Sequence, residues 1–295
     1  MTNQEESHFV QVHTLANRFE ADLLMGALEQ EEIPAFLRSF EETPYDGLFV
    51  SQRGWGWIMV REDQAERARA ILQPLIDELA AKRLFDDPSQ IDPLLWEKLR
   101  QADRSAICSN GQVRYDTERS AYVVPFLGST FACSPEQEFI EDLGPAPFLK
   151  LNFEFYLVML HYLLESQSKP LAGKWVSEKD IPGGELFFRG PHSFPIDPLI
   201  ELFGSRPELF RAAAKELDGA PLDLGDHSFR FWPFPRVPLA IVLWEGDDEF
   251  QPAFNIRFDA SLNLQLRTLD TIWALVNVVC RTLRAAGKDL LSKTA

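Results

Sequence analysis

The stretch FLKLNFEFYLVMLHYLLES, residues 148–166, constrains the fold of this chain more than any other segment. Helical spacing places its apolar side chains almost all round, and a helix of that kind belongs inside a core. A core that surrounds a helix needs a sizeable domain. The chain can supply one, because its 295 residues are 45% hydrophobic and include 23 Phe and 7 Trp. This length suffices for two ordinary domains or one large domain.

Residues 8–84 predict a small first domain. Apolar and polar residues alternate over 8–14, as in a half-buried strand, and residues 18–32 have the spacing of an amphipathic helix with Leu23, Leu24 and Leu28 on one face. A strand over residues 33–40 is expected to follow, then a hairpin of two strands at 48–52 and 57–62, and then a helix over 63–84. Asp63 is the expected cap of the last helix, and Pro74 is expected to kink or break it. The order β-α-β-β-α is most of a ferredoxin-like half-sandwich.

Residues 92–286 predict a larger α+β domain after a linker at 85–93. Asp92-Pro93 is typical of a helix start, and this first helix is expected to run to Cys108. Three strands near the C-terminus, residues 227–234, 237–244 and 253–259, are expected to form an antiparallel meander. Residues 268–286 predict a closing helix. The predicted fold class is therefore α+β, with a ferredoxin-like domain followed by this larger one.

The charge of the chain disfavours two classes of partner. The net charge is -16 with a pI of about 4.8, and residues 1–80 alone carry 15 acidic and 6 basic residues. Binding to nucleic acid or to anionic membranes needs clustered Lys and Arg, which the sequence lacks. We therefore expect neither partner.

Cysteine usage indicates a reducing compartment. Cys108, Cys133 and Cys280 form no CxxC pair, so neither a disulfide framework nor a local zinc or iron–sulfur site is expected. The first twelve residues are polar and acidic, unlike a signal peptide. The predicted location is the cytoplasm.

The acidic stretch LWEGDDEFQPAFNIRFD, residues 243–259, is the first candidate site. Asp247, Glu249 and Asp259 could supply oxygen ligands to a divalent cation, whereas Glu245 and Asp248 are expected to face solvent. The competing interpretation of the turn is a solvated hairpin, and it is favoured. For Asp259, a cap of backbone N–H groups and a metal ligand are equally expected.

Two further stretches could contact a ligand or a partner. In KWVSEKDIPGGE, residues 174–185, Lys174 could bind an anion while Gly183 and Gly184 approach the ligand closely, although an ordinary turn is more common. In FRFWPFPRVP, residues 229–238, Trp232 and Arg236 are candidates for an interface or a flat-ligand pocket. The competing interpretation there is core plus a rigid loop.

No histidine or nucleophile motif points to catalysis. The five histidines show no HExxH spacing, and no GxSxG elbow occurs. His161 is expected to be a core histidine, whereas His192 and His227 flank loops and could meet the acidic turn. No catalytic residue is predicted.

The first domain resembles a family called the putative prokaryotic signal-transducing domain. The resemblance covers about residues 9–73 and is carried by Glu20-Ala21, Leu28, Ile33 and WGWIMVREDQAERARAIL. It implies a ferredoxin-like fold, and "signal-transducing" is the name of that family rather than an established activity. Domains of this shape commonly pair edge to edge, so a homodimer is one expected assembly.

The second domain resembles an uncharacterised domain family of anaerobic and metal- or sulfate-reducing bacteria. The matching pieces are VRYDTERSAYVVPFLG, PLAGKWVSEKDIPGGELFFRGP, FPRVPLAIVLWEGDDEF and IRFDAS, over about residues 95–285. Some relatives adjoin four-cysteine iron–sulfur modules, whereas the first domain here has no cysteine. The resemblance implies no catalytic residue.

These features predict a regulatory or ligand-binding protein, with a small molecule or another protein as its partner. The alternative is a metal- or cofactor-dependent enzyme, or a cofactor-assembly factor, of anaerobic metabolism with its site near residues 245–259.

Overall fold

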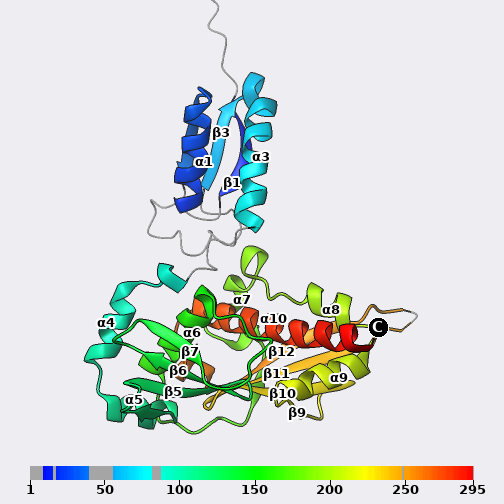
Figure 1. Cartoon of the computed structure of the whole chain (residues 1–295). Coiled ribbons are helices and arrows are strands. Elements are labelled where there is room, and N and C mark those ends of the chain that lie inside the picture. Colours follow the sequence, from blue (N-terminus) through cyan, green and yellow to red (C-terminus); the bar gives the residue numbers. More distant parts are fainter. Residues whose placement is uncertain (1–8, 16–17, 40–55, 82–87, 248, 295) are drawn as a thin grey trace, which may run out of the picture. The chain divides into compact units, whose positions relative to one another are not determined.

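The computed structural model describes residues 9–15, 18–39, 56–81, 88–247 and 249–294. The chain divides into two compact units, one made of Met1–Leu84 with Leu186–Ser193 and the other of Phe85–Glu185 with Phe194–Ala295. Helices and antiparallel sheets occur together along the chain (Figure 1). The predicted α+β class, with a closing C-terminal helix, is therefore confirmed.

Within its described residues, the first unit has a three-stranded antiparallel sheet and two long α-helices. Its elements are β1 (Phe9–Leu15), α1 (Arg18–Gln30), β2 (Ala35–Ser39), β3 (Gly56–Arg61) and α3 (Ala65–Ala81). The strands lie in the order β1-β3-β2, and Leu24, Leu28, Ile58 and Val60 form a buried core with Leu72. The predicted order β-α-β-β-α is present. Assignment to the ferredoxin-like class stays a prediction, and the expected strand at 48–52 lies outside the described residues.

Three details of the first unit differ from prediction. A short 3-10 turn, Glu62–Gln64, precedes α3, so Asp63 does not cap the helix and instead pairs with Arg61 at 3.0 Å. The helix also continues through Pro74, because the apolar side of α3, including Leu72, stays packed against the core. Leu23 is 41% exposed, since the apolar stripe of α1 is narrower than its spacing suggested.

The second unit begins with two helices where one was predicted. These are α4 (Pro93–Gln101) and α5 (Arg104–Gly111). Asp92 caps α4 as expected, accepting from the N–H of Leu94 at 2.9 Å. The break follows from Asp103, whose side chain accepts from the N–H of Ser105 at 2.9 Å and so starts a new helix.

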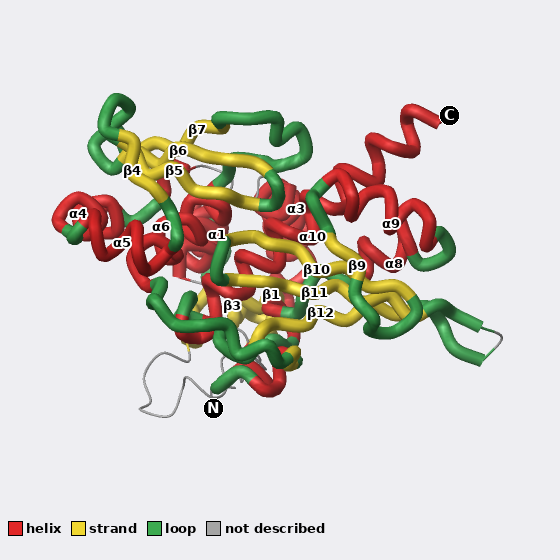
Figure 2. The backbone as a smooth tube through the Cα atoms, turned by 90° about the horizontal axis from the view of Figure 1, so that it is seen from below, coloured by secondary structure: helices red, strands yellow, loops and turns green. Residues whose placement is uncertain are grey.

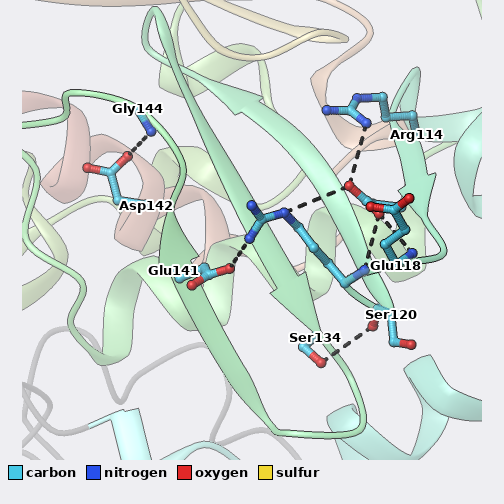
Figure 3. Close-up of polar contacts among 9 residues, drawn as sticks. Arg114, Glu118, Ser120, Ser134, Glu141, Asp142 and Gly144 are labelled. Atoms are coloured by element: carbon cyan, nitrogen blue, oxygen red, sulfur yellow. Dashed lines mark hydrogen bonds and ion pairs between the residues drawn. The ribbon is translucent and has the colours of Figure 1, made fainter.

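A four-stranded antiparallel sheet follows, in the order β4-β5-β6-β7. Its strands are β4 (Arg114–Asp116), β5 (Ala121–Phe126), β6 (Ser129–Ser134) and β7 (Phe139–Asp142), the last of which the sequence did not predict. Figure 3 shows polar side chains of this sheet, among them Arg114, Glu118 and Glu141. Arg119 lies 3.1 Å from Glu141 and 3.9 Å from Asp116. Exposed ion pairs of this kind add little stability.

The predicted meander forms the centre of a five-stranded sheet in the order β8-β12-β11-β10-β9. The strands are β8 (Trp175–Val176), β9 (Ala220–Pro221), β10 (His227–Phe234), β11 (Val237–Trp244) and β12 (Ala253–Asp259). Phe231, Leu239 and Phe258 occupy one register row on its buried face. The helix α10 (Leu269–Thr294) lies over this sheet and is longer than predicted (Figure 1).

The apolar helix predicted within residues 148–166 is α6 (Phe153–Glu165), and it is buried as predicted. It packs beside α10, where Arg281 forms an ion pair with Glu154 at 2.7 Å. The remaining helices are α7 (Gly184–Phe187), α8 (Asp197–Phe203) and α9 (Pro207–Glu216). No helix in the described ranges is long and apolar enough to cross a membrane.

Candidate functional site

The acidic turn between β11 and β12 is a closed, solvent-facing loop. Asp247 Oδ1 accepts from the N–H groups of Glu249 and Phe250 at 2.8 and 2.7 Å, and the N–H of Asp247 donates to the carbonyl of Phe250 at 2.9 Å. These backbone donors lower the pKa of Asp247. The carboxylate therefore shapes its own turn, as the competing interpretation proposed.

Glu245 ties this turn to the loop before β10. Its carboxylate lies 2.5 Å from His227 Nε2, and its N–H donates to Asp226 at 2.8 Å. The expected meeting of His227 with the acidic stretch does occur, but it reaches Glu245 rather than the proposed ligands. Asp248 lies outside the described residues.

Asp259 is a buried carboxylate with several backbone donors, and only 5% of the residue is exposed. Its Oδ1 accepts from the N–H of Ala172 at 2.9 Å and from the N–H and hydroxyl of Ser261 at 2.9 and 2.5 Å. Its Oδ2 accepts from the N–H of Gly173 at 2.7 Å. Burial opposes ionisation, but these hydrogen bonds outweigh it and lower the pKa of Asp259.

The three proposed metal ligands are not brought together. Asp247 and Glu249 precede β12, whereas Asp259 ends it, and a strand of this length spans about 20 Å. Within the described ranges, no group of three or more His, Cys, Asp or Glu side chains is placed to hold a metal ion. The length of β12 keeps the acidic turn and Asp259 at opposite ends of the strand.

Arg236 spreads its donors over backbone carbonyls of two loops. Its Nε donates to the carbonyl of Asn110, and its Nη1 donates to that of Lys169 at 2.9 Å. Its own N–H donates to the hydroxyl of Tyr162 at 3.3 Å, which in turn donates to the carbonyl of Gly111 at 2.7 Å. Arg236 was predicted as a candidate ligand contact. In the structure its side chain instead links the end of α5 to the segment after α6, and we call this link the clamp.

Residues 166–174, which we call the tether, connect α6 to β8. Several side chains hold its backbone: Gln265 accepts from Gln167 N–H at 3.1 Å, Arg236 donates to Lys169, and Asp259 accepts from residues 172 and 173. The carbonyl of Lys174 also accepts from Ala260 N–H at 2.9 Å. Lys174, Arg236 and Asp259, which the sequence proposed separately, therefore meet at one segment.

The paired glycines form a turn. Gly183 has a φ of +79°, which favours glycine, and a Cβ added there would lie 3.3 Å from Leu269 Cδ1. The N–H of Gly184 donates to the carbonyl of Ile181 at 2.8 Å and begins α7. Both roles match the turn that was the more common interpretation.

Trp232 borders an open hollow where the two sheets of the second unit adjoin. The hollow has a volume of about 380 Å³. Its lining consists of Pro125, Phe126, Gly128, Ser129, Thr130, Asp218, Trp232 and Pro235. The carbonyl of Trp232 accepts from Leu127 N–H at 3.0 Å, which fixes β10 beside the β5–β6 turn. One candidate from the sequence thus lines a hollow with hydroxyl, carboxyl and aromatic groups.

In the part of the chain that the structure describes, the other histidines and the cysteines offer no comparable arrangement. His161 lies 2.7 Å from Glu165 on the same helix, and the ring of His192 stacks on Phe187 at 4.4 Å. Cys133 and Cys280 are buried, which raises the pKa of both thiols.

Together, the fold and this hollow define a two-unit α+β protein whose second unit contains an open hollow beside Trp232. Residues 103–282 match the family described as domain of unknown function DUF3786. The match covers more than half of the chain, so the chain belongs to this family. No curated protein and no solved structure matches the chain.

Two arginines of the five-stranded sheet were not among the site candidates predicted from the sequence. The guanidinium of Arg230 lies over the ring of Trp232, 5.2 Å from its centroid, and Arg257 lies on the same face of the sheet. The sequence does place each arginine on the polar side of its strand, because each one lies between two buried apolar residues.

Proposed function

We propose that this protein is a regulatory, ligand-binding protein of the cytoplasm, and that its second unit holds the ligand in the hollow beside Trp232. The proposal rests on that hollow, which combines an aromatic wall with the hydroxyls of Ser129 and Thr130 and the carboxylate of Asp218. Concave sites with a few convergent polar groups are the usual form of small-molecule sites. The free cysteines support a reducing compartment.

The hollow is favoured over the other candidates because their polar groups have internal partners. Asp247 and Asp259 accept backbone hydrogen bonds, and Arg236 donates to two carbonyls. A metal-dependent enzyme at residues 245–259 would need carboxylates that converge. We therefore do not extend the proposal to that alternative.

Native mass spectrometry of the full chain, purified without oxygen, tests the proposal. We expect the wild type to retain an added mass, or to gain one from a metabolite panel, and we expect Trp232→Ala to lose it. Trp244→Ala is the matched control, because Trp244 is 47% exposed on the neighbouring strand and does not line the hollow. Retention of the same ligand by Trp232→Ala would refute the proposed site.

For the first unit we propose a partner-interaction role, with a homodimer as the simplest assembly. Phe9 and Phe36 are 39% and 43% exposed, and their ring centroids lie 4.9 Å apart. Exposed aromatic pairs are typical of interfaces. Light scattering at working concentration should give a dimeric mass, and a monomeric mass would contradict this part of the proposal.

A further inference from the structure

We infer that the ligand of the second unit is a planar anion, and that Arg230 and Arg257 bind its charge on the outer face of the five-stranded sheet. The inference rests on the proposed function and specifies its ligand class. The chemistry that fits is a flat ring carrying a phosphate or carboxylate, as in a mononucleotide.

The two arginines occupy one row of this sheet. Arg230 is paired in register with Ala240 on β11, and Ala240 is paired with Arg257 on β12. Cross-strand partners point to the same face, so both guanidiniums are on the face opposite the buried phenylalanines. Two strand spacings place their Cα atoms about 10 Å apart. An anionic group can therefore lie between them.

Arg230 and Arg257 are half-buried members of this row, and Ala240 between them is fully buried. Figure 2 shows the backbone of β10, β11 and β12 side by side in the five-stranded sheet. The loop before β10 covers one end, because a Cβ added to Gly225 would lie 2.6 Å from Val242 Cγ1. The tether bounds the other end, where residues 172 and 173 reach Asp259. The arginine row lies between these two loops.

Neither arginine has an ion-pair partner within 4.0 Å among the described residues, although the chain has a net charge of -16. Arg230 stacks on Trp232, which pre-organises its planar donors, and Arg257 makes only a 3.3 Å bond to the carbonyl of Ile256. Asp180 is influenced by the charge of Arg257, but its carboxylate already accepts from Ser177. Both cations thus remain available to an anion.

The neighbouring hollow indicates that the ligand contains a flat ring. Trp232 belongs both to the arginine stack and to the lining of the hollow, so a ring lying against it would bring its charged group toward Arg230. Asp218 in the lining can accept a hydrogen bond from a ring amine. A long polyanion is disfavoured because the acidic chain would repel it, which points to a small ligand.

Matched pairs of charged and neutral probes test the inference on the full chain. We would measure binding of AMP against adenosine, and of FMN against riboflavin, by calorimetry at two salt concentrations. AMP or FMN should bind more tightly than its neutral partner, and added salt should weaken the binding of the anion. Arg230→Gln and Arg257→Gln should each lower the affinity for the anion about tenfold, as expected for the loss of one charge-assisted contact.

Two further variants separate charge from folding. Arg230→Lys keeps the charge and should retain most of the affinity, and Arg211→Gln removes an exposed arginine of α9 and should change nothing. Equal binding of charged and neutral probes, or no binding of either anion, would overturn the inference. If Trp232→Ala abolishes binding of a neutral ligand while both arginine variants bind it normally, the proposed function survives and the inference fails.

Discussion

Replacement of Asp259 by asparagine removes one acceptor and one charge from the hydrogen-bond group that fastens the tether. Asparagine can present its carbonyl where Oδ1 lies and so keep acceptance from Ala172 and Ser261. Its amide then faces the N–H of Gly173, where two donors meet and the 2.7 Å bond is lost. The hydrogen bonds from Ala172 and Ser261 that remain then have a neutral acceptor in place of a charged one.

The expected cost follows from these contacts. One lost charge-assisted hydrogen bond and one unsatisfied, part-buried N–H together cost about 2–3 kcal/mol of unfolding free energy. Asp259→Ala leaves every donor without its acceptor and should cost about 3–5 kcal/mol. The same donors explain why the pKa of Asp259 is lowered despite its burial.

The difference between wild type and Asp259→Asn should depend on pH. The folded pKa lies below the unfolded value of about 3.9, so the charged carboxylate stabilises the fold above that value. The stabilisation is lost as the pH falls through the folded pKa. The difference should therefore be constant above about pH 5 and shrink below about pH 4.

Urea unfolding across this pH range measures the difference, and hydrogen exchange of the tether peptides locates it. Asp247→Asn is the matched control, because that carboxylate also accepts two backbone N–H groups but is exposed, and asparagine can accept both. It should change stability by less than about 0.5 kcal/mol. A similarly small effect of Asp259→Asn, or unchanged protection of the tether, would refute the reasoning.

Further predictions concern the clamp and the thiols. Arg236→Lys should lower the unfolding free energy by about 2 kcal/mol, because a single ammonium cannot reach both carbonyls, and a neutral result in urea unfolding would contradict the clamp. Tyr162→Phe, which removes a buried donor, should cost about 1–2 kcal/mol in the same assay, and a stabilised variant would be the contrary outcome. In native protein at pH 8, a thiol reagent should react at Cys108 and spare Cys133 and Cys280, whose burial raises their pKa, that of Cys280 to about 12; urea should expose all three.

Local sequence patterns predicted much of the fold. Three apolar-rich segments within residues 227–259 correctly predicted the meander, and the apolar helix was correctly placed in the core. The patterns failed where one side chain changes the path of the backbone. Asp103 divides a helix that periodicity alone reads as continuous, and the short strand β7 has too few residues to show a period.

The candidate site was less accessible to sequence reasoning. The capping interpretation of Asp259 could be formed from its position after a strand, but its partners at 172 and 173 are distant in sequence. The arginine row depends on register across three strands, which a single sequence does not contain. Sequence patterns therefore identified candidate residues that lie near each other along the chain. They did not identify the contacts of Asp259 with residues 172 and 173 or the row that Arg230 and Arg257 share, which depend on the fold.

The position of α10 has a consequence for synthesis on the ribosome. The described strands β1–β3 and the helices α1 and α3 are complete by Ala81. The five-stranded sheet of the second unit, in contrast, is covered by α10, which is translated last. Until Leu269–Thr294 emerges, the apolar face of β10–β12 has no α10 over it and Glu154 has no Arg281. Transient exposure of such a face favours aggregation. Chains that stop before α10 should therefore need chaperones, while the nascent first unit can already be folded.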